Sequence, residues 1–103
     1  MSAATILRLE VDCHAYAWHE PHPDYTECGP DNLVRMAETY GVLVRHLPEH
    51  AWADWAYWYE IIGPYEHIVR LLTDEYTGDE EAARDMADCA TAWQRIPTKE
   101  NEQ

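Results

Sequence analysis

The first residues of the chain alternate between apolar and polar side chains. Arg8 and Glu10 separate apolar neighbours, which is a partial period of two and predicts a strand over residues 5–11, with a continuation through residue 17. A short helix that begins after Asp12 is the alternative. Residues 19–31 then contain three prolines and one glycine, so this segment is expected to be a loop.

From residue 31 onward the apolar residues recur at intervals of three and four, which is typical of amphipathic helices. Pro48, the pair Gly63 and Pro64, and the break at residues 77–79 divide this part of the chain. The pattern therefore predicts about four helices, which cover residues 31–47, 48–62, 64–76 and 80–96.

The second predicted helix has an aromatic stripe. Four of its aromatic side chains share one arc of about 120°, as core-facing residues do: Trp52, Trp55, Trp58 and Tyr59. We expect them to form the centre of the bundle. Tyr57 falls on the opposite side of the same helix, where it is expected to be exposed.

These elements predict a mainly α fold, namely a small bundle of about four helices preceded by one N-terminal strand or hairpin. The class becomes α+β if the strand pairs. Residues 1–97 are expected to form a single acidic helical domain that includes the loop at 19–31, and residues 98–103 a disordered tail. Because an unpaired strand exposes its backbone groups, a homodimer joined through the N-terminal strand is an alternative.

The chain has a strong excess of acidic residues. Lys and Arg number 7 and Asp and Glu number 20, which gives a net charge of −13 at pH 7. Such a field repels a phosphate backbone and attracts basic surfaces. We therefore expect a basic protein as the partner and no direct contact with nucleic acid. Adaptation to high salt is an alternative source of the acidity.

The sequence contains no segment that is typical of export or membrane insertion. The amino-terminal residues lack a basic region, and no apolar run approaches the roughly 18 residues of a membrane span. We expect no membrane association and a cytoplasmic location in a bacterial or archaeal cell, with a phage gene as one conceivable origin. The 3 cysteines fit reduced thiols better than a disulfide framework.

Acidic residues concentrate toward the carboxyl end. Seven of them lie within fifteen residues and are opposed there by Arg84 alone: Asp74, Glu75, Asp79, Glu80, Glu81, Asp85 and Asp88. On a helix, the spacing of Glu81, Asp85 and Asp88 places their side-chain bases about 5–6 Å apart, which resembles the spacing of phosphates along a nucleic-acid strand. These seven residues are the predicted partner-binding site, together with Asp54 and with Tyr57 as an aromatic anchor.

The loop region contains the side chains that zinc prefers. Five such residues lie within sixteen positions: Cys13, His14, His19, His22 and Cys28. Their spacing does not match that of structural zinc sites, so they are weak candidates for a metal site. The alternative is a polar loop in which Cys13 packs as a small apolar side chain.

Motifs of catalysis are missing from the sequence. It has no Gly-rich phosphate loop, no Ser-centred elbow, no Cys-x-x-Cys pair and no Glu that is followed three residues later by His. We therefore predict neither an enzyme nor a resident cofactor.

In size, acidity and expected helical content the chain resembles nucleic-acid mimics, anti-CRISPR and other phage inhibitors of defence nucleases, and immunity proteins against nuclease toxins. The resemblance is one of general character and rests on no shared motif. It implies a small inhibitor that occupies the basic nucleic-acid-binding surface of a partner. Two alternatives stay open, namely a metal-binding or small-ligand module that uses residues 13–28, and an acidic adaptor subunit of a salt-adapted organism.

Overall fold

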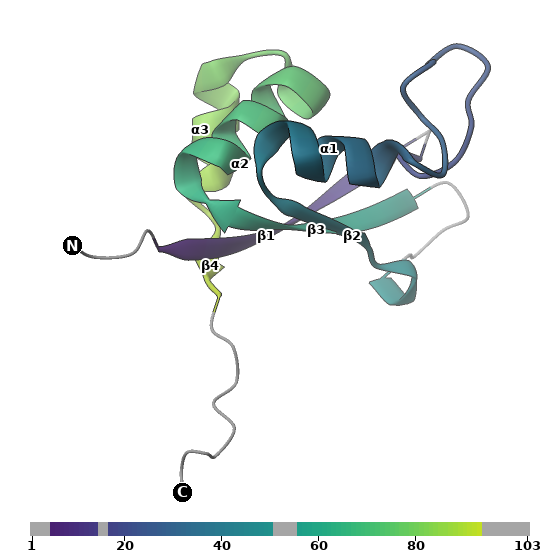
Figure 1. The fold of residues 1–103 in the computed structure, drawn as a ribbon. Coiled ribbons are helices and arrows are strands. Elements are labelled where there is room, and N and C mark those ends of the chain that lie inside the picture. Colours follow the sequence, from purple (N-terminus) through teal and green to yellow (C-terminus); the bar gives the residue numbers. More distant parts are fainter. Residues whose placement is uncertain (1–4, 15–16, 51–55, 94–103) are drawn as a thin grey trace, which may run out of the picture.

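The computed structural model describes residues 5–14, 17–50 and 56–93, which form an antiparallel four-stranded sheet with helices on one face (Figure 1). The strands follow the order β2-β3-β1-β4 in the sheet. Their bounds are β1 (Ile6–His14), β2 (Leu43–His46), β3 (Ala56–Pro64) and β4 (Thr91–Ala92). The helical elements are α1 (Asn32–Tyr40), the 3-10 turn η1 (Pro48–His50), α2 (Tyr65–Leu72), the π-helical turn η2 (Thr73–Thr77) and α3 (Glu80–Ala87).

The fold is therefore α+β, and the predicted mainly α bundle of about four helices is wrong. The predicted N-terminal strand is confirmed as β1, and the helical segment after Pro64 is confirmed as α2 with η2. Residues 43–46, 56–64 and 91–92 are strands instead of helices, so the predicted helix over residues 80–96 ends at Ala87. The antiparallel sheet, absent from the prediction, is the centre of the molecule.

The predicted helix over residues 31–47 ends early. Gly41 adopts a left-handed conformation, with φ of 67°, and its N–H donates to the carbonyl of Ala37. This arrangement is a common way to end a helix, and glycine adopts it without steric cost. The chain then turns into β2, where Val44 is a residue type that favours strands.

The predicted helix over residues 48–62 is replaced by β3 for a different reason. Tyr59 and Ile61 point to the helical layer, and Glu60 and Ile62 point to the other face, yet all four residues are buried. Because both faces are covered, apolar side chains occupy consecutive positions, and periodicity alone does not separate such a strand from a buried helix.

β1 and β3 pair along their whole length, from Ile6 opposite Pro64 to His14 opposite Ala56. Alternate side chains of this pair face the helices and form the core with them. The largest fully buried side chains of the molecule include Trp18, Tyr59, Met36, Leu47, Ile61, Ile68, Leu71 and Leu72. Since β1 pairs within its own chain, the reason for a homodimer through the N-terminal strand no longer holds, and that dimer stays an untested prediction.

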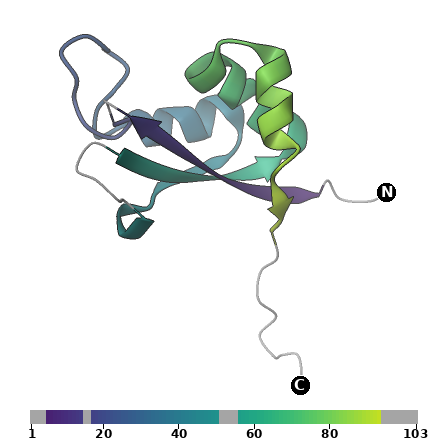
Figure 2. The same ribbon diagram turned by 180° about the vertical axis from the view of Figure 1, so that it is seen from behind.

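No α-helix of the described residues covers the opposite face of the sheet, as Figure 2 shows from behind. Among the described helical elements only the short turn η1 lies there, with His50 Nδ1 at 3.3 Å from Glu10. Its centre is charged. The buried carboxylate of Glu60 accepts hydrogen bonds from Arg8 Nε at 2.5 Å and from Arg45 Nε at 2.7 Å. Arg8 also pairs with Glu10 at 2.6 Å. The sheet therefore separates an apolar layer under the helices from an ionic network on its other face.

None of the described helices has the length and apolar character needed to cross a bilayer. Trp52, Asp54, Trp55 and the predicted tail at 98–103 lie outside the residues that the structure describes.

Candidate functional site

The part of the predicted acidic segment that begins at Asp79 coincides with the start of α3. Gly78, in a left-handed conformation, ends η2 with its N–H bonded to Thr73 O. The carboxylate of Asp79 then accepts from the N–H of Ala82 at 2.8 Å, which caps the first turn of α3. α3 buries Ala83 and Ala87, so its acidic side chains are left on the outer sides of the helix. We call Asp79, Glu80, Glu81, Asp85 and Asp88 the α3 acidic surface.

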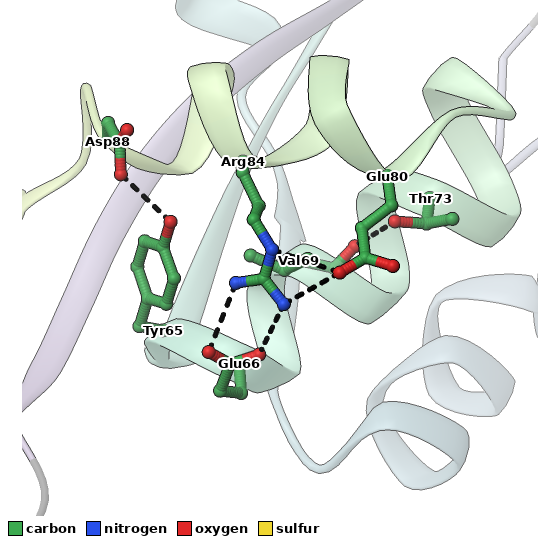
Figure 3. A network of polar contacts seen from close by, with 7 residues as sticks. All are labelled: Tyr65, Glu66, Val69, Thr73, Glu80, Arg84 and Asp88. Atoms are coloured by element: carbon green, nitrogen blue, oxygen red, sulfur yellow. Dashed lines mark hydrogen bonds and ion pairs between the residues drawn. The ribbon is translucent and has the colours of Figure 1, made fainter.

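One side of the α3 acidic surface is bound to α2. Figure 3 shows Arg84 between two carboxylates, with both of its terminal nitrogens on Glu66 at 3.1 Å and its Nη2 on Glu80 at 2.8 Å. The hydroxyl of Tyr65 donates to Asp88 at 2.8 Å. The hydrogen bonds from Arg84 hold the pKa of Glu66 below its usual range. This network joins two exposed helix faces and favours the ionised form of Glu66.

The other side of the α3 acidic surface makes no ion pair with the residues that the structure describes. Glu81 and Asp85 lie one helical turn apart and are exposed, and neither carboxylate makes an ion pair with any described residue. They are the part of the predicted acidic stripe that has no cationic partner in the described part of the chain. Asp88, the third member of that stripe, is instead turned toward Tyr65.

Asp74 and Glu75 belong to a different environment. Glu75 accepts from both terminal nitrogens of Arg35, at 3.0 and 3.1 Å, and from the hydroxyl of Tyr40 at 2.8 Å. Tyr40 also lies 3.2 Å from Asp74. Burial and the hydrogen bond to Glu75 raise the pKa of Tyr40. Glu75 therefore connects η2 to α1 inside the protein, and its charge is compensated by Arg35.

A small pocket of about 130 Å³ lies beside this connection. Its walls come from the loop after Ala17, the start of α1 and η2, and they include Trp18, Cys28, Asp74 and Glu75. The pocket is too small for a drug-sized ligand, since such ligands take roughly 300–1,000 Å³.

Tyr57 does not occupy the exposed helical position that the sequence predicted, because residues 56–64 form β3. It lies opposite Cys13 on the helix-facing side of the sheet, where it is partly buried against the core. Its ring also lies 6.0 Å from that of His19 in an edge-on contact. Tyr57 is thus a packing residue in this fold, and Asp54 lies outside the described residues.

The weak metal candidates are dispersed by the fold. Cys13 is in the core, and burial raises the pKa of its thiol to about 12. His14 lies on the other face of β1, with its Nε2 at 2.7 Å from Asp12. Cys28 is partly buried in the loop.

His19 and His22 each contact aromatic rings. The imidazole of His19 stacks on that of His46 at 4.0 Å and bonds to the hydroxyl of Tyr59 at 2.7 Å. His22 lies 4.6 Å from the ring of Tyr25. Within residues 5–14, 17–50 and 56–93, no three His, Cys, Asp or Glu side chains are placed to hold a metal ion.

The sequence does not reveal how the basic residues are used. Four arginines lie in ion pairs within the chain: Arg8, Arg35, Arg45 and Arg84. Each of the four binds a carboxylate at least 15 positions away along the sequence, and such pairs are visible only once the fold is known. The spacing of Glu80 and Arg84 at i and i+4 is the one signal that sequence reasoning could have used.

Comparisons of the chain with protein-family models, with curated proteins and with solved structures gave no match. The geometry of the chain itself therefore carries the functional argument.

Asp79 gives a first test of this geometry. Asp79→Ala removes the cap of α3 and is expected to lower the free energy of unfolding by about 1 kcal/mol, measured by urea denaturation. Asp79→Ser keeps a capping oxygen but removes the charge, so its stability should stay close to that of the wild type. If both variants are less stable than the wild type by the same amount, the cap contributes nothing and Asp79 acts through its charge.

Proposed function

We propose that the protein binds a basic partner protein through the α3 acidic surface and thereby occupies the partner's nucleic-acid-binding region. Glu81 and Asp85 are the central contacts. Electrostatic attraction between these carboxylates and Lys or Arg side chains accelerates encounter, and the bound domain blocks access of nucleic acid to the same side chains.

One observation carries this proposal. The arginines of the described sheet and helices are largely engaged with carboxylates of the same chain, as in the pairs of Arg35 with Glu75 and of Arg84 with Glu66. Because these arginines are paired elsewhere, they do not neutralise Glu81 and Asp85. The chain as a whole has a net charge of −13. A small domain needs a net charge of only about 2–8 for solubility, so the excess is larger than solubility requires.

The arrangement also supports protein binding over catalysis. Glu81 and Asp85 lie on the convex outer side of a helix, whereas catalytic carboxylates are generally held in a concave pocket that excludes water. A rigid helix that displays evenly spaced charges suits an extended basic groove. The Arg84 network fixes α3 against α2, so that these charges are held in place before binding (Figure 3).

The test uses three forms of the protein as affinity matrices, namely the wild type, Glu81→Gln with Asp85→Asn, and Asp24→Asn with Asp31→Asn. Both double variants remove two negative charges, but the second removes them from exposed positions in or next to the loop. We expect nucleic-acid-binding proteins to be retained by the wild type and the loop variant and lost from the α3 variant. Unfolding curves should be the same for all three.

A purified retained protein is then mixed with a labelled DNA duplex. The wild type should displace the duplex, and its affinity should fall steeply between 50 and about 200 mM salt because exposed charges are screened. The α3 variant should bind about tenfold or more weakly and depend less on salt. Equal loss in both double variants would mean that net charge, and not this surface, determines binding.

A further inference from the structure

An apolar groove of about 460 Å³ lies at one end of the sheet. Its walls include Ile6, Ile62, Leu43 and Trp93, which come from three strands and the residue after β4, and Val42 from the α1–β2 turn. Leu43 is 63% exposed and Trp93 is 38% exposed. An exposed apolar groove of this kind on a chain with a large net charge indicates a contact surface.

The groove adjoins the open edge of β2. The N–H of Leu47 donates to the carbonyl of Trp58 at 2.7 Å. In an antiparallel pair every second residue bonds to the neighbouring strand, so this bond shows which residues of β2 bond to β3. Arg45 therefore bonds to β3, while the backbone groups of Val44 and His46 point away from it. β2 is the outermost strand among the described residues, so these groups face no described strand.

The charges around β2 are acidic. Glu38 lies on the exposed side of α1 before β2, and Glu49 is exposed in η1 after it; neither makes an ion pair with a residue in the described ranges. The nearby guanidinium of Arg45 is tied to Glu60 at 2.7 Å. A second copy of the chain would bring the same acids and a second charge of −13 to this edge. Charge complementarity thus favours a basic occupant.

We propose that the β2 edge and the adjoining groove bind an extended basic segment of a partner protein. The segment adds to β2 as a further strand, bonds to the backbone groups of Val44 and His46, and places an apolar side chain beside Leu43 in the groove. Lys or Arg at its alternate positions points to the helical side of the sheet and meets Glu38 of α1. The basic character of the partner is shared with the proposed function, but this surface is independent of α3.

The probe is a fluorescent eight-residue peptide of alternating lysine and valine. The control peptide has the same sequence with two successive central amides N-methylated, which blocks both of its edges for strand pairing. Amide hydrogen exchange of the protein is followed by NMR. We expect the first peptide to slow exchange at Val44 and His46 and not at Glu10, which lies at the opposite edge, and the methylated peptide to have no such effect.

Two matched pairs of variants test the surface. Val44→Pro removes an outward N–H while keeping the bonds between β2 and β3, and proline is tolerated at sheet edges. It should weaken peptide binding about tenfold. Leu43→Ser should also weaken binding, whereas Val34→Ser, at an equally exposed residue outside the groove, should not. Glu81→Gln with Asp85→Asn should leave the protection of Val44 and His46 intact, which separates this proposal from the preceding one.

Three results would overturn the proposal. The first is unchanged exchange at Val44 and His46 with either peptide. The second is protection of these amides without peptide, in a species of dimeric mass by sedimentation, which would assign the edge to a second copy of the chain. The third is protection that disappears on truncation after Trp93, which would assign the edge to the chain's own final residues.

Discussion

Tyr59→Ala is expected to destabilise the protein strongly at ambient temperature. Tyr59 is fully buried in β3, and its ring lies 4.8 Å from that of Trp18. Replacing a buried aromatic residue by alanine costs about 3–5 kcal/mol, which is a large part of the roughly 5–15 kcal/mol that stabilises a domain. Circular dichroism and urea denaturation should show a lower midpoint and a population of unfolded chains without denaturant.

The hydroxyl of Tyr59 has a separate role that Tyr59→Phe isolates. It accepts from the backbone N–H of Trp18 at 2.8 Å and bonds to His19 at 2.7 Å, and so ties the loop after β1 to the sheet. Phenylalanine leaves the buried N–H of Trp18 without this acceptor, at an expected cost of about 1–3 kcal/mol. Tyr65→Phe removes an exposed hydroxyl and should cost much less. Equal losses in these two variants would contradict the role of the buried hydroxyl.

Glu60→Gln is expected to give the second large effect, and one that depends on pH. Burial alone raises the pKa of Glu60, but the hydrogen bonds from Arg45 and Arg8 outweigh it and hold the pKa below its ordinary value of 4.5. The folded chain therefore binds fewer protons than the unfolded chain near this value. The ionised carboxylate stabilises the fold above pH 4.5, and this contribution is lost as the pH falls through the folded-state pKa.

The difference in unfolding free energy between the wild type and Glu60→Gln should thus be larger at pH 7 than at about pH 3. Removing one partner of a buried ion pair costs about 3–5 kcal/mol, and the loss here should be smaller because the side chain of Arg45 is 62% exposed. Urea denaturation at both pH values measures it. Glu38→Gln, at an exposed carboxylate, is the control and should show no such dependence. A constant difference for Glu60→Gln would contradict the ionic role.

The elements that could be predicted from the sequence are those with local signals. β1 shows alternation because its outer face is polar, and α2 and α3 are bounded by Pro64 and Gly78. β2 could not be recognised because the apolar residues at 43 and 44 continue the helical spacing of the apolar residues in α1. β3 was hidden because burial of both faces removes alternation, which is a tertiary effect and leaves no local trace.

The candidate site could be predicted in part for the same reason. The carboxylates of Glu81 and Asp85 share one side of α3 by helical spacing alone, which requires only that the helix exists. The binding of Glu75 to Arg35 could not be foreseen, because it joins residues of two elements that are brought together by the fold. The groove beside Leu43 is also non-local, since the sheet assembles its walls from separate strands.

The register of β1 with β3 has a consequence for synthesis of the chain. Ile6 pairs with Pro64, and every other pair of these strands also joins residues far apart in sequence. During translation β1 therefore emerges from the ribosome before β3 does. Its apolar side chains stay unpaired until β3 follows. Such distant pairings generally slow folding and expose nascent chains to aggregation. The chain is strongly acidic, and like charges repel neighbouring chains. We expect this repulsion to limit aggregation of nascent chains before β1 pairs with β3.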